Sequence, residues 1–201
     1  MSGTGLHTLF TKSEARRTVV NRRKEFQPEE LYRKSKLIID RLIASDDFHF
    51  AKKIHTYIAS RPGEIDTHYL IDKMEGLGKT IILPKLHKQS KKFHRANFMG
   101  WEHLAKNSDG YIEPLIAFDE GLSDIDLIIV PTIAVSLVGQ RVGYGGGYYD
   151  SLLKQTHSTK IVLAFELQIF NYIETELHDV RIDKIITELR TINTRESLRK
   201  D

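Results

Sequence analysis

The stretch IDLIIVPTIAVSLVGQRVGYGGGYYD, residues 125–150, decides the fold class. Residues 125–130 form a nearly continuous apolar run, as expected for a strand that is covered on both faces, and Pro131 ends it. A glycine-rich loop follows, and a helix is expected to begin near Gly147. A buried strand, a loop and a helix in this order indicate one unit of a parallel, helix-covered sheet.

Strands and helices alternate along the rest of the chain. We expect further strands at residues 53–59, 80–83, 93–99, 161–165 and 184–187, with Pro84 stopping the second of them. Helices are expected at 12–26 and 28–45, and a third begins at a cap formed by Asp66 and Thr67 and runs to Gly76 or Gly78. We therefore predict one α/β domain over residues 1–201, a three-layer α/β/α sandwich with a mostly parallel sheet, on which helices 12–45 pack.

Composition excludes several protein classes. Hydrophobic residues make up 40% of the 201-residue chain and charged residues 28%, a balance typical of globular rather than disordered proteins. The absence of cysteine excludes a disulfide scaffold, a thiolate nucleophile and a cysteine-ligated metal. No apolar run reaches the length of a membrane span, and the opening residues lack the apolar core of a signal peptide. We therefore expect a cytoplasmic protein without a membrane segment.

Positive charge is unevenly distributed. Residues 12–36 contain nine Lys and Arg and four Glu, and residues 76–101 contain no acidic residue. A basic segment attracts phosphates or polycarboxylates, although the same pattern is common in solvated surface loops. A net charge of +3 is too small to indicate a nucleic-acid-binding protein, so an RNA-binding module is kept only as an alternative.

The glycine loop, GQRVGYGGGYYD at residues 139–150, is the most informative local feature. Glycines allow backbone N–H groups to converge on a phosphate, and the following helix N-terminus adds a favourable dipole. Arg141 is suited to a bidentate phosphate contact. A tight turn that needs glycine for its geometry is the alternative. The loop matches neither the Walker pattern nor G-x-G-x-x-G, so a dinucleotide-binding oxidoreductase is not favoured, although Glu166 lies near the distance expected of its ribose-binding acid.

Charged residues elsewhere are candidates for the same phosphate site. Lys12 and Arg16 lie one helical turn apart and project from the same face, as they also would on an ordinary charged helix. Asp150 and Asp179 carry carboxylates suited to Mg²⁺ if the fold brings them together, and each is otherwise explained as a turn cap. Glu64, in a turn, is either an acceptor for a heterocycle that carries N–H groups or a plain turn acid.

The order of these motifs resembles the 5-formyltetrahydrofolate cyclo-ligase family. The most specific part is the glycine loop with the segment before it, PTIAVSLVGQRVGYGGGYYD at residues 131–150. The other shared motifs, between residues 12 and 188, are KSEAR, GEIDT, GKTIILPK, IEP, LAFELQ and HDVRIDKIITE. So many motifs in the family's order make the resemblance specific.

The resemblance implies a fold and a reaction. The fold would be similar to that of the sugar-phosphate isomerase and CoA-transferase group. The reaction would use ATP and Mg²⁺ to convert 5-formyltetrahydrofolate into 5,10-methenyltetrahydrofolate, ADP and phosphate. Basic residues within 85–95 would attract the glutamate tail of a polyglutamylated substrate, and the enzyme would act as a monomer.

The resemblance also assigns roles to residues of this sequence. Asp150 and Asp179 would hold Mg²⁺, and Glu64 would bind the pterin end of the folate. The ATP-binding residues would be Lys12, Arg16, Arg141, Gly143, Tyr144, Gly145, Gly146, Gly147, Tyr148 and Tyr149. The folate would also contact Gly145, Gly147, Tyr148 and Tyr149. Arg141 and Tyr149 would be catalytic.

The sequence departs from the family pattern at Val135, Ser136 and Ser151, where the family usually has Phe, Asp and Arg. These changes remove no proposed phosphate or metal group, but they would alter the wall of the folate pocket. A paralogue that binds ATP or folate without the activity is therefore a second alternative.

Overall fold

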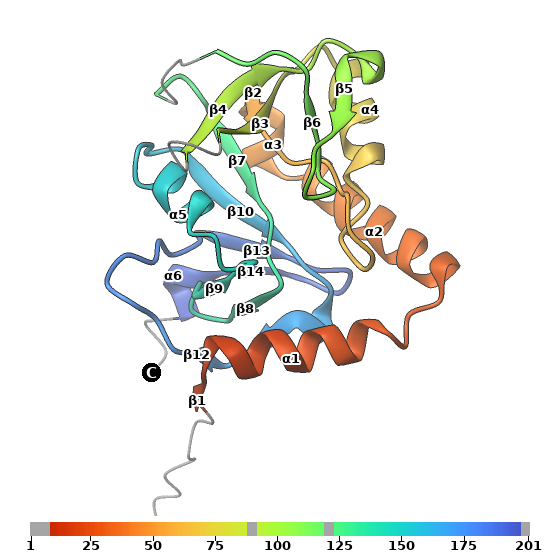
Figure 1. Cartoon of the computed structure of the whole chain (residues 1–201). Coiled ribbons are helices and arrows are strands. Elements are labelled where there is room, and N and C mark those ends of the chain that lie inside the picture. The colour runs from red at the N-terminus through yellow and green to blue at the C-terminus, as the bar shows by residue number, and fades with distance from the viewer. Residues whose placement is uncertain (1–8, 88–91, 119–122, 198–201) are drawn as a thin grey trace, which may run out of the picture.

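A seven-stranded sheet forms the centre of the computed structural model, which describes residues 9–87, 92–118 and 123–197 (Figure 1). Its strands, in spatial order, are β14 (Thr191–Asn193), β13 (Lys184–Ile186), β10 (Thr159–Leu163), β7 (Leu127–Val130), β2 (Lys53–His55), β3 (Thr80–His87) and β4 (Lys92–Asn97). Neighbouring strands from β13 to β3 run parallel, whereas β14 and β4 are antiparallel edge strands. The mostly parallel sheet predicted from the sequence is confirmed.

Helices cover both faces of this sheet, but unequally. One face is covered by three helices, α2 (Pro28–Ile43), α3 (Asp46–Phe50) and α4 (Thr67–Gly76), whose apolar side chains form one core with the sheet. The other face is covered by α5 (Tyr148–Leu153), which contributes Leu152 and Leu153 to a second core. The shorter cover on the second face leaves room there for loops.

The central strand β7 joins the two cores. Leu127 and Ile129 point into the first core, and Ile128 and Val130 into the second, because side chains alternate along a strand. None of the four is more than 1% exposed. Burial of each such side chain contributes about 1.5–3 kcal/mol relative to exposure, which explains why this strand needs an unbroken apolar sequence.

The first helix, α1 (Lys12–Arg23), packs on a separate small sheet at the bottom of Figure 1. That sheet has the order β11 (Ile169–Phe170), β8 (Ala134–Ser136) and β9 (Arg141–Val142). Ala15 and Val19 of α1 are fully buried in the third core, between the helix and this sheet. Thr11 and Glu14 form a capping box that fixes the start of the helix.

The remaining elements are short. β1 (Leu9–Phe10) pairs in parallel with β12 (Tyr172–Ile173), and β5 (Leu104–Lys106) pairs with β6 (Ile112–Pro114) in a hairpin. The 3-10 turns η1 (Trp101–His103) and η2 (Glu166–Gln168) and the helix α6 (Thr194–Ser197) complete the structure. Within residues 9–87, 92–118 and 123–197, each helix is too short or too polar to cross a bilayer.

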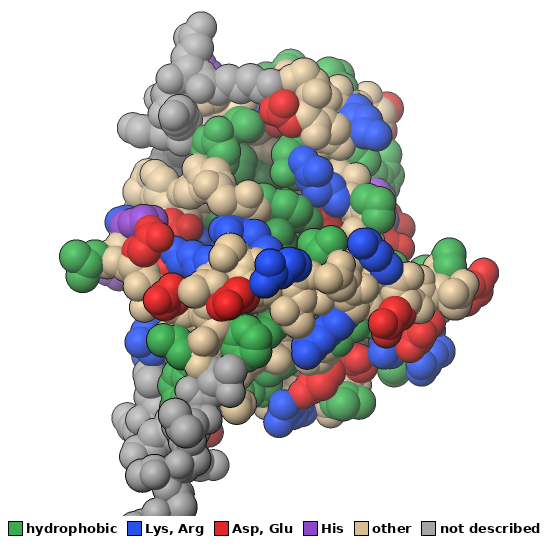
Figure 2. Space-filling view, turned by 60° about the horizontal axis from the view of Figure 1, so that its bottom comes forward, with side chains coloured by type: hydrophobic (Ala, Val, Ile, Leu, Met, Phe, Trp, Pro, Cys, Tyr) green, Lys and Arg blue, Asp and Glu red, His purple; other side chains and the backbone are tan. Residues whose placement is uncertain are grey.

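Charged side chains of both signs are mixed over the face shown in Figure 2. On α2, Lys34 forms an ion pair with Glu30 at 3.1 Å, and Lys36 forms one with Asp40 at 2.7 Å. Part of the basic N-terminal segment is therefore neutralised locally. This arrangement does not favour an RNA-binding surface, which needs a continuous basic area.

The prediction that Pro84 stops a strand was wrong. β3 continues through Pro84 to His87, and Pro84 lies opposite Arg95 of β4. Beyond Ile82, β3 has lost its pairing with β2, so one side of the strand is free of that neighbour. The N–H of Leu86 points away from β4 and donates to the Glu113 side chain of β6 at 3.2 Å. Backbone groups two residues apart in a strand point to the same side, so the Pro84 nitrogen also points away from β4. A missing N–H therefore costs no ladder hydrogen bond there.

Other boundaries shifted by a few residues. The strand expected at 53–59 ends at His55, and the expected helix 28–45 ends at Ile43 and is followed by the separate helix α3. Ser45 caps α3 through a hydrogen bond from the Phe48 N–H at 3.3 Å, which explains the break. The edge strand β14 was not expected.

The buried histidine of β2 makes the stability depend on pH. His55 is 1% exposed, and burial, with a smaller contribution from the positive charge of Arg95, lowers its pKa to about 3. The unfolded chain takes up this proton near pH 6.5, so unfolding binds a proton between the two values. We expect the free energy of unfolding to fall by about 1.4 kcal/mol per pH unit from this residue alone as the pH drops below 6.5.

Urea unfolding of the wild type and of His55→Leu at several pH values above 4 tests this expectation. The variant should show a flatter decline of stability with falling pH, because leucine does not titrate. Parallel declines in the two proteins would contradict the assignment.

Candidate functional site

A cavity of about 970 Å³ lies beside the carboxyl ends of β2 and β7. Tyr57 and Pro131, which follow these strands closely, both line it. Ligands of open parallel sheets commonly bind outside this edge, and the volume is in the range of cavities that bind small molecules. The position of the cavity therefore marks it as the candidate site.

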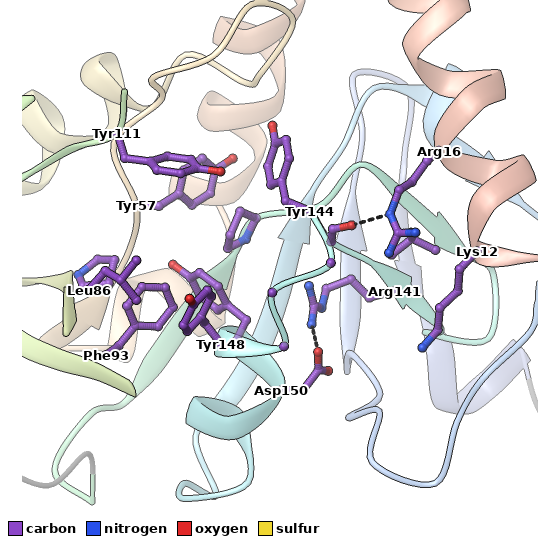
Figure 3. Close-up of a pocket in the computed structure, with 18 of the residues that line it drawn as sticks. Lys12, Arg16, Tyr57, Leu86, Phe93, Tyr111, Arg141, Tyr144, Tyr148 and Asp150 are labelled. Carbon is purple, nitrogen blue, oxygen red and sulfur yellow. Dashed lines mark hydrogen bonds and ion pairs between the residues drawn. The ribbon is translucent and has the colours of Figure 1, made fainter. Parts of the chain in front are cut away.

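The glycine loop divides the cavity into two halves (Figure 3). The half that we call the aromatic half is lined by Tyr57, Leu86, Phe93, Tyr111 and Tyr148. The other, the charged half, is lined by Lys12, Arg16, Arg141, Asp150 and Asp179. One half thus offers flat apolar surfaces, and the other offers fixed charges.

Glycine is required by the geometry of the loop. Gly147 caps α5 with a φ of +69°, in the left-handed region that other residues rarely adopt. At Gly146, a Cβ atom would lie 2.4 Å from a ring carbon of Tyr148. Helix α5 does begin directly after Gly147, as expected from the sequence.

Arg16 connects the first helix to this loop. Its Nε donates a hydrogen bond of 2.8 Å to the carbonyl oxygen of Gly143. The bond uses one donor of the guanidinium group, and its terminal nitrogens remain beside the cavity near Gly145. The helix and the loop are thereby held in one charged half, as the phosphate-site prediction requires.

Arg141 and Asp150 form an ion pair in the same half. The Arg141 Nη2 lies 2.8 Å from an Asp150 carboxylate oxygen, and the arginine side chain is only 4% exposed. Its Nε is buried and has no hydrogen-bond partner among the described residues. A buried guanidinium with unused donors is suited to bind an anion.

Lys12 and Asp179 form a second ion pair. Lys12 Nζ lies 2.7 Å from Asp179, and the backbone N–H of Glu176 donates to the same carboxylate at 2.7 Å. Partial burial raises the pKa of Asp179, but the Glu176 N–H and the Lys12 ammonium outweigh burial, so the pKa lies below its ordinary value. Asp179 is therefore ionised at neutral pH.

The two candidate metal ligands meet in the charged half. The N–H of Val180, the residue after Asp179, donates to the second Asp150 oxygen at 3.3 Å. Among the described residues, no group of three or more His, Asp or Glu side chains is arranged to hold a metal ion. Two carboxylates fit Mg²⁺, which in nucleotide sites takes its other ligands from phosphates and water.

Glu64 lies across the loop from these charges. Its Oε2 accepts hydrogen bonds from the backbone N–H groups of Ser60 and Arg61, at 2.8 and 3.0 Å. Its Oε1 accepts a hydrogen bond of 2.6 Å from the hydroxyl of Tyr144. The side chain of Tyr144, predicted to bind ATP, is thus directed to Glu64 rather than to the charged half.

Tyr149, in the first turn of α5, is partly buried against the second core. Its hydroxyl is buried and has no hydrogen-bond partner in the described part of the chain. Burial raises the pKa of Tyr149 well above the ordinary value, and the positive charge of Arg141 only partly offsets this. Phe93 contacts its ring edge-on, with centroids 5.2 Å apart. The phenol is therefore neutral and available as a hydrogen-bond donor.

Several residues that were considered for the site from the sequence do not line the cavity. Val135 and Ser136 are fully buried in β8, where Ser136 Oγ donates to Gln140 at 2.8 Å, and Ser151 also does not line the cavity. The expected change to the wall of the pocket was therefore wrong for these positions. Glu166 lies in η2 and pairs with Arg190.

The basic segment 85–95 contributes fewer available charges than expected. Lys85 Nζ donates to the carbonyl oxygens of Pro114 and Leu115, and Arg95 pairs with Asp124 at 2.8 Å. Lys88 and Lys91 lie outside the described residues. The described part of this segment therefore mainly supports the structure of the β3–β4 edge.

Sequence reasoning missed much of the aromatic half. Tyr57, Phe93 and Arg61 were not selected, although all three line the cavity. Arg61 lies over the ring of Tyr111, with its guanidinium carbon 4.3 Å from the ring centroid. Tyr57 lies within one predicted strand and Phe93 begins another, but aromatic residues at such positions are equally common in cores.

The sequence matches the 5-formyltetrahydrofolate cyclo-ligase family over residues 10–188. The chain belongs to this family. The glycine loop, both ion pairs and Glu64 all lie within the matched residues. The family resemblance derived from the sequence motifs is confirmed.

Individual cyclo-ligase relatives match over most of the chain. A Caenorhabditis elegans protein named probable 5-formyltetrahydrofolate cyclo-ligase is 29% identical, covering 90% of this chain and 94% of the relative. The mouse 5-formyltetrahydrofolate cyclo-ligase is 29% identical, covering 88% and 93%. The solved structure of Aquifex aeolicus 5,10-methenyltetrahydrofolate synthetase superposes with a TM-score of 0.80 at 30% identity, covering 92% and 93%. The family match over residues 10–188 includes every described residue that lines the cavity.

The left-handed backbone of the glycine loop predicts the result of one substitution. Gly147→Ala has open space for its Cβ but must keep a φ of +69°, so it should lower the free energy of unfolding by about 1–2 kcal/mol. Gly76→Ala is the matched control, because Gly76 is helical, its φ is ordinary and its Cβ also meets open space. Denaturant unfolding should show no loss for Gly76→Ala. Equal stability of both variants would show that the loop is not held in this conformation.

Proposed function

We propose that this cyclo-ligase family member converts 5-formyltetrahydrofolate into 5,10-methenyltetrahydrofolate with consumption of ATP. One observation carries the proposal: the cavity combines an aromatic half with a charged half, and the glycine loop lies between them. A folate has a flat heterocycle and ATP has a polyphosphate. A reaction that joins the two at one atom needs both kinds of surface within a single cavity.

The chemistry explains why ATP is needed. The formyl oxygen of an amide-like group is a poor leaving group. Transfer of the γ-phosphoryl group breaks its bond to ADP and forms a bond to this oxygen. The second folate nitrogen then attacks the activated carbon and loses its proton, and phosphate leaves as the ring closes. The protein contributes mainly by aligning the two substrates and neutralising charge.

ATP phosphates would bind in the charged half. Arg16 and Lys12 project there from α1, and the backbone N–H groups of the glycine loop, residues 143–147, are able to converge on an anion. Arg141 keeps unused donors beside this loop. Lys12 would exchange part of its contact with Asp179 for a phosphate oxygen. Tyr144 would take part in ATP binding through its backbone only.

Asp150 and Asp179 would hold Mg²⁺ together with the phosphates. Their carboxylates lie in the charged half, and each is opposite a cation, Arg141 or Lys12. A bound Mg²⁺ would neutralise charge on the transferred phosphoryl group. The two ion pairs hold both carboxylates in position.

The folate would bind in the aromatic half. Glu64 would accept hydrogen bonds from pterin N–H groups, and Tyr148 would pack on the substrate from the helix N-terminus. The neutral hydroxyl of Tyr149 would donate a hydrogen bond near the reacting formyl group. Such a donor orients the formyl oxygen toward the charged half without acting as a base.

Other sequence-based expectations stay predictions. They are the similarity to the sugar-phosphate isomerase and CoA-transferase fold, the single domain, the monomeric state, the cytoplasmic location and binding of polyglutamylated folate. The intermixed surface charges and the family membership do not favour the RNA-binding alternative.

The direct test is near-ultraviolet absorbance of 5-formyltetrahydrofolate mixed with the protein, Mg²⁺ and ATP, against the same mixture without ATP. The methenyl product has an extended conjugated system that the substrate lacks, so an ATP-dependent rise is expected. If folded protein that binds both ligands gives no rise, the proposed reaction is wrong and a non-catalytic paralogue is favoured.

The proposed metal ligand gives a sharper test. Asp150→Asn should lower turnover on the order of a hundredfold and raise the Mg²⁺ concentration needed, because an amide is a weaker ligand for Mg²⁺ than a carboxylate. Asp72→Asn is the control, since Asp72 accepts a hydrogen bond from the indole N–H of Trp101 and neither residue lines the cavity. The measurement is turnover at increasing Mg²⁺ concentrations. An unchanged Mg²⁺ dependence in Asp150→Asn would contradict the assignment.

A further inference from the structure

The hydrogen bond between Tyr144 and Glu64 crosses the cavity. It joins the glycine loop to the turn at residues 60–64. Tyr144 and Glu64 are 80 positions apart in the sequence. Its length of 2.6 Å is typical of a hydroxyl that donates to a charged oxygen. Glu64 itself is only 9% exposed. Glu64 lines the cavity, and the hydroxyl of Tyr144 occupies its Oε1 there.

The two oxygens of Glu64 differ in how firmly they are held. Oε2 accepts two backbone N–H groups of its own turn, three and four residues away, so it is fixed by local structure. Oε1 accepts from a side chain on a different loop. Only Oε1 can change its partner without rearranging the turn.

Tyr144 is able to leave. Its side chain is 43% exposed, so it is not locked by packing. Its ring contacts Tyr111 edge-on, with centroids 6.3 Å apart, and the Arg61 guanidinium at 5.2 Å from its centroid. The next residue, Gly145, has a φ of +99° and a Cβ position free of close contacts, so the backbone can adjust there at low cost.

We propose that Tyr144 is a specificity-determining residue: its hydroxyl occupies Glu64 Oε1 until a ligand with its own N–H donor replaces it. This inference rests on the proposed function, in which the donor belongs to the pterin ring of the folate. A heterocycle with a matching N–H restores the hydrogen bond that Tyr144 gives up. A ligand without such a donor must leave a buried carboxylate oxygen unpaired, which disfavours it roughly tenfold or more.

The contact itself can be tested in the ligand-free protein by amide hydrogen exchange of residues 60–64 and 143–147. Tyr144→Phe keeps the ring but removes the donor, and should speed exchange in both segments roughly tenfold. Tyr111→Phe is the matched control, because it keeps the ring contact with Tyr144 and leaves the Glu64 bond intact. Unchanged exchange in Tyr144→Phe would overturn the proposal.

The competition is tested by calorimetric binding of 5-formyltetrahydrofolate without ATP. Tyr144→Phe should bind it roughly tenfold more tightly than the wild type, because the ligand no longer displaces a hydroxyl. In a Glu64→Gln background the same substitution should have a smaller effect, because a neutral amide holds the hydroxyl less strongly. Unchanged or weaker binding by Tyr144→Phe, or an equal effect in both backgrounds, would overturn the proposal.

The outcomes separate the inference from the function on which it rests. If neither the wild type nor any variant binds the folate, the proposed function is wrong. Folate is then also not the ligand that displaces Tyr144. Faster exchange in Tyr144→Phe would in that case still support the closed contact. Tight folate binding that Tyr144→Phe leaves unchanged supports the function and overturns the role of Tyr144.

Discussion

The complete burial of β7 is the constraint on which the rest of the structure depends. Its side chains supply both cores, and its backbone pairs with β2 on one side and β10 on the other. The chain leaves this strand at Val130, directly beside the cavity. Because two cores and two neighbouring strands hold β7 in place, the backbone position from which the next segments continue is fixed. The small sheet and the glycine loop are built outward from there.

The site uses this rigidity to keep unlike groups apart. Cations from α1 and β9 lie on one side of the glycine loop, and rings from β4, α5 and the loop after β2 lie on the other. Each candidate carboxylate has a partner within the protein: Arg141 for Asp150, Lys12 for Asp179 and Tyr144 for Glu64. A ligand therefore exchanges partners with groups that are already oriented. Little reorganisation is then needed at the moment of reaction.

The sequence allowed the sheet class, most elements and the charged half of the site to be predicted. Residues 125–150 were decisive because an apolar run, closely spaced glycines and a helix start each have a local physical cause. The strand end predicted at Pro84 was wrong because proline ends a strand only where its missing N–H would have paired with a neighbouring strand. The pairing of β3 with β2 has already ended at Ile82. The aromatic half was largely missed because Tyr57 and Phe93 converge only through tertiary structure. The direction of the Tyr144 side chain toward Glu64 has no local signal at all.

The contacts of the first helix have a consequence for how the molecule forms. Arg16 bonds to Gly143, and Lys12 to Asp179, which lie 127 and 167 residues further along the chain. Contacts between such distant residues close late, since a long loop must be ordered first. During synthesis, the first helix leaves the ribosome long before either partner. The charged half is therefore expected to be assembled only when nearly the whole chain has been made, after the central sheet has begun to form.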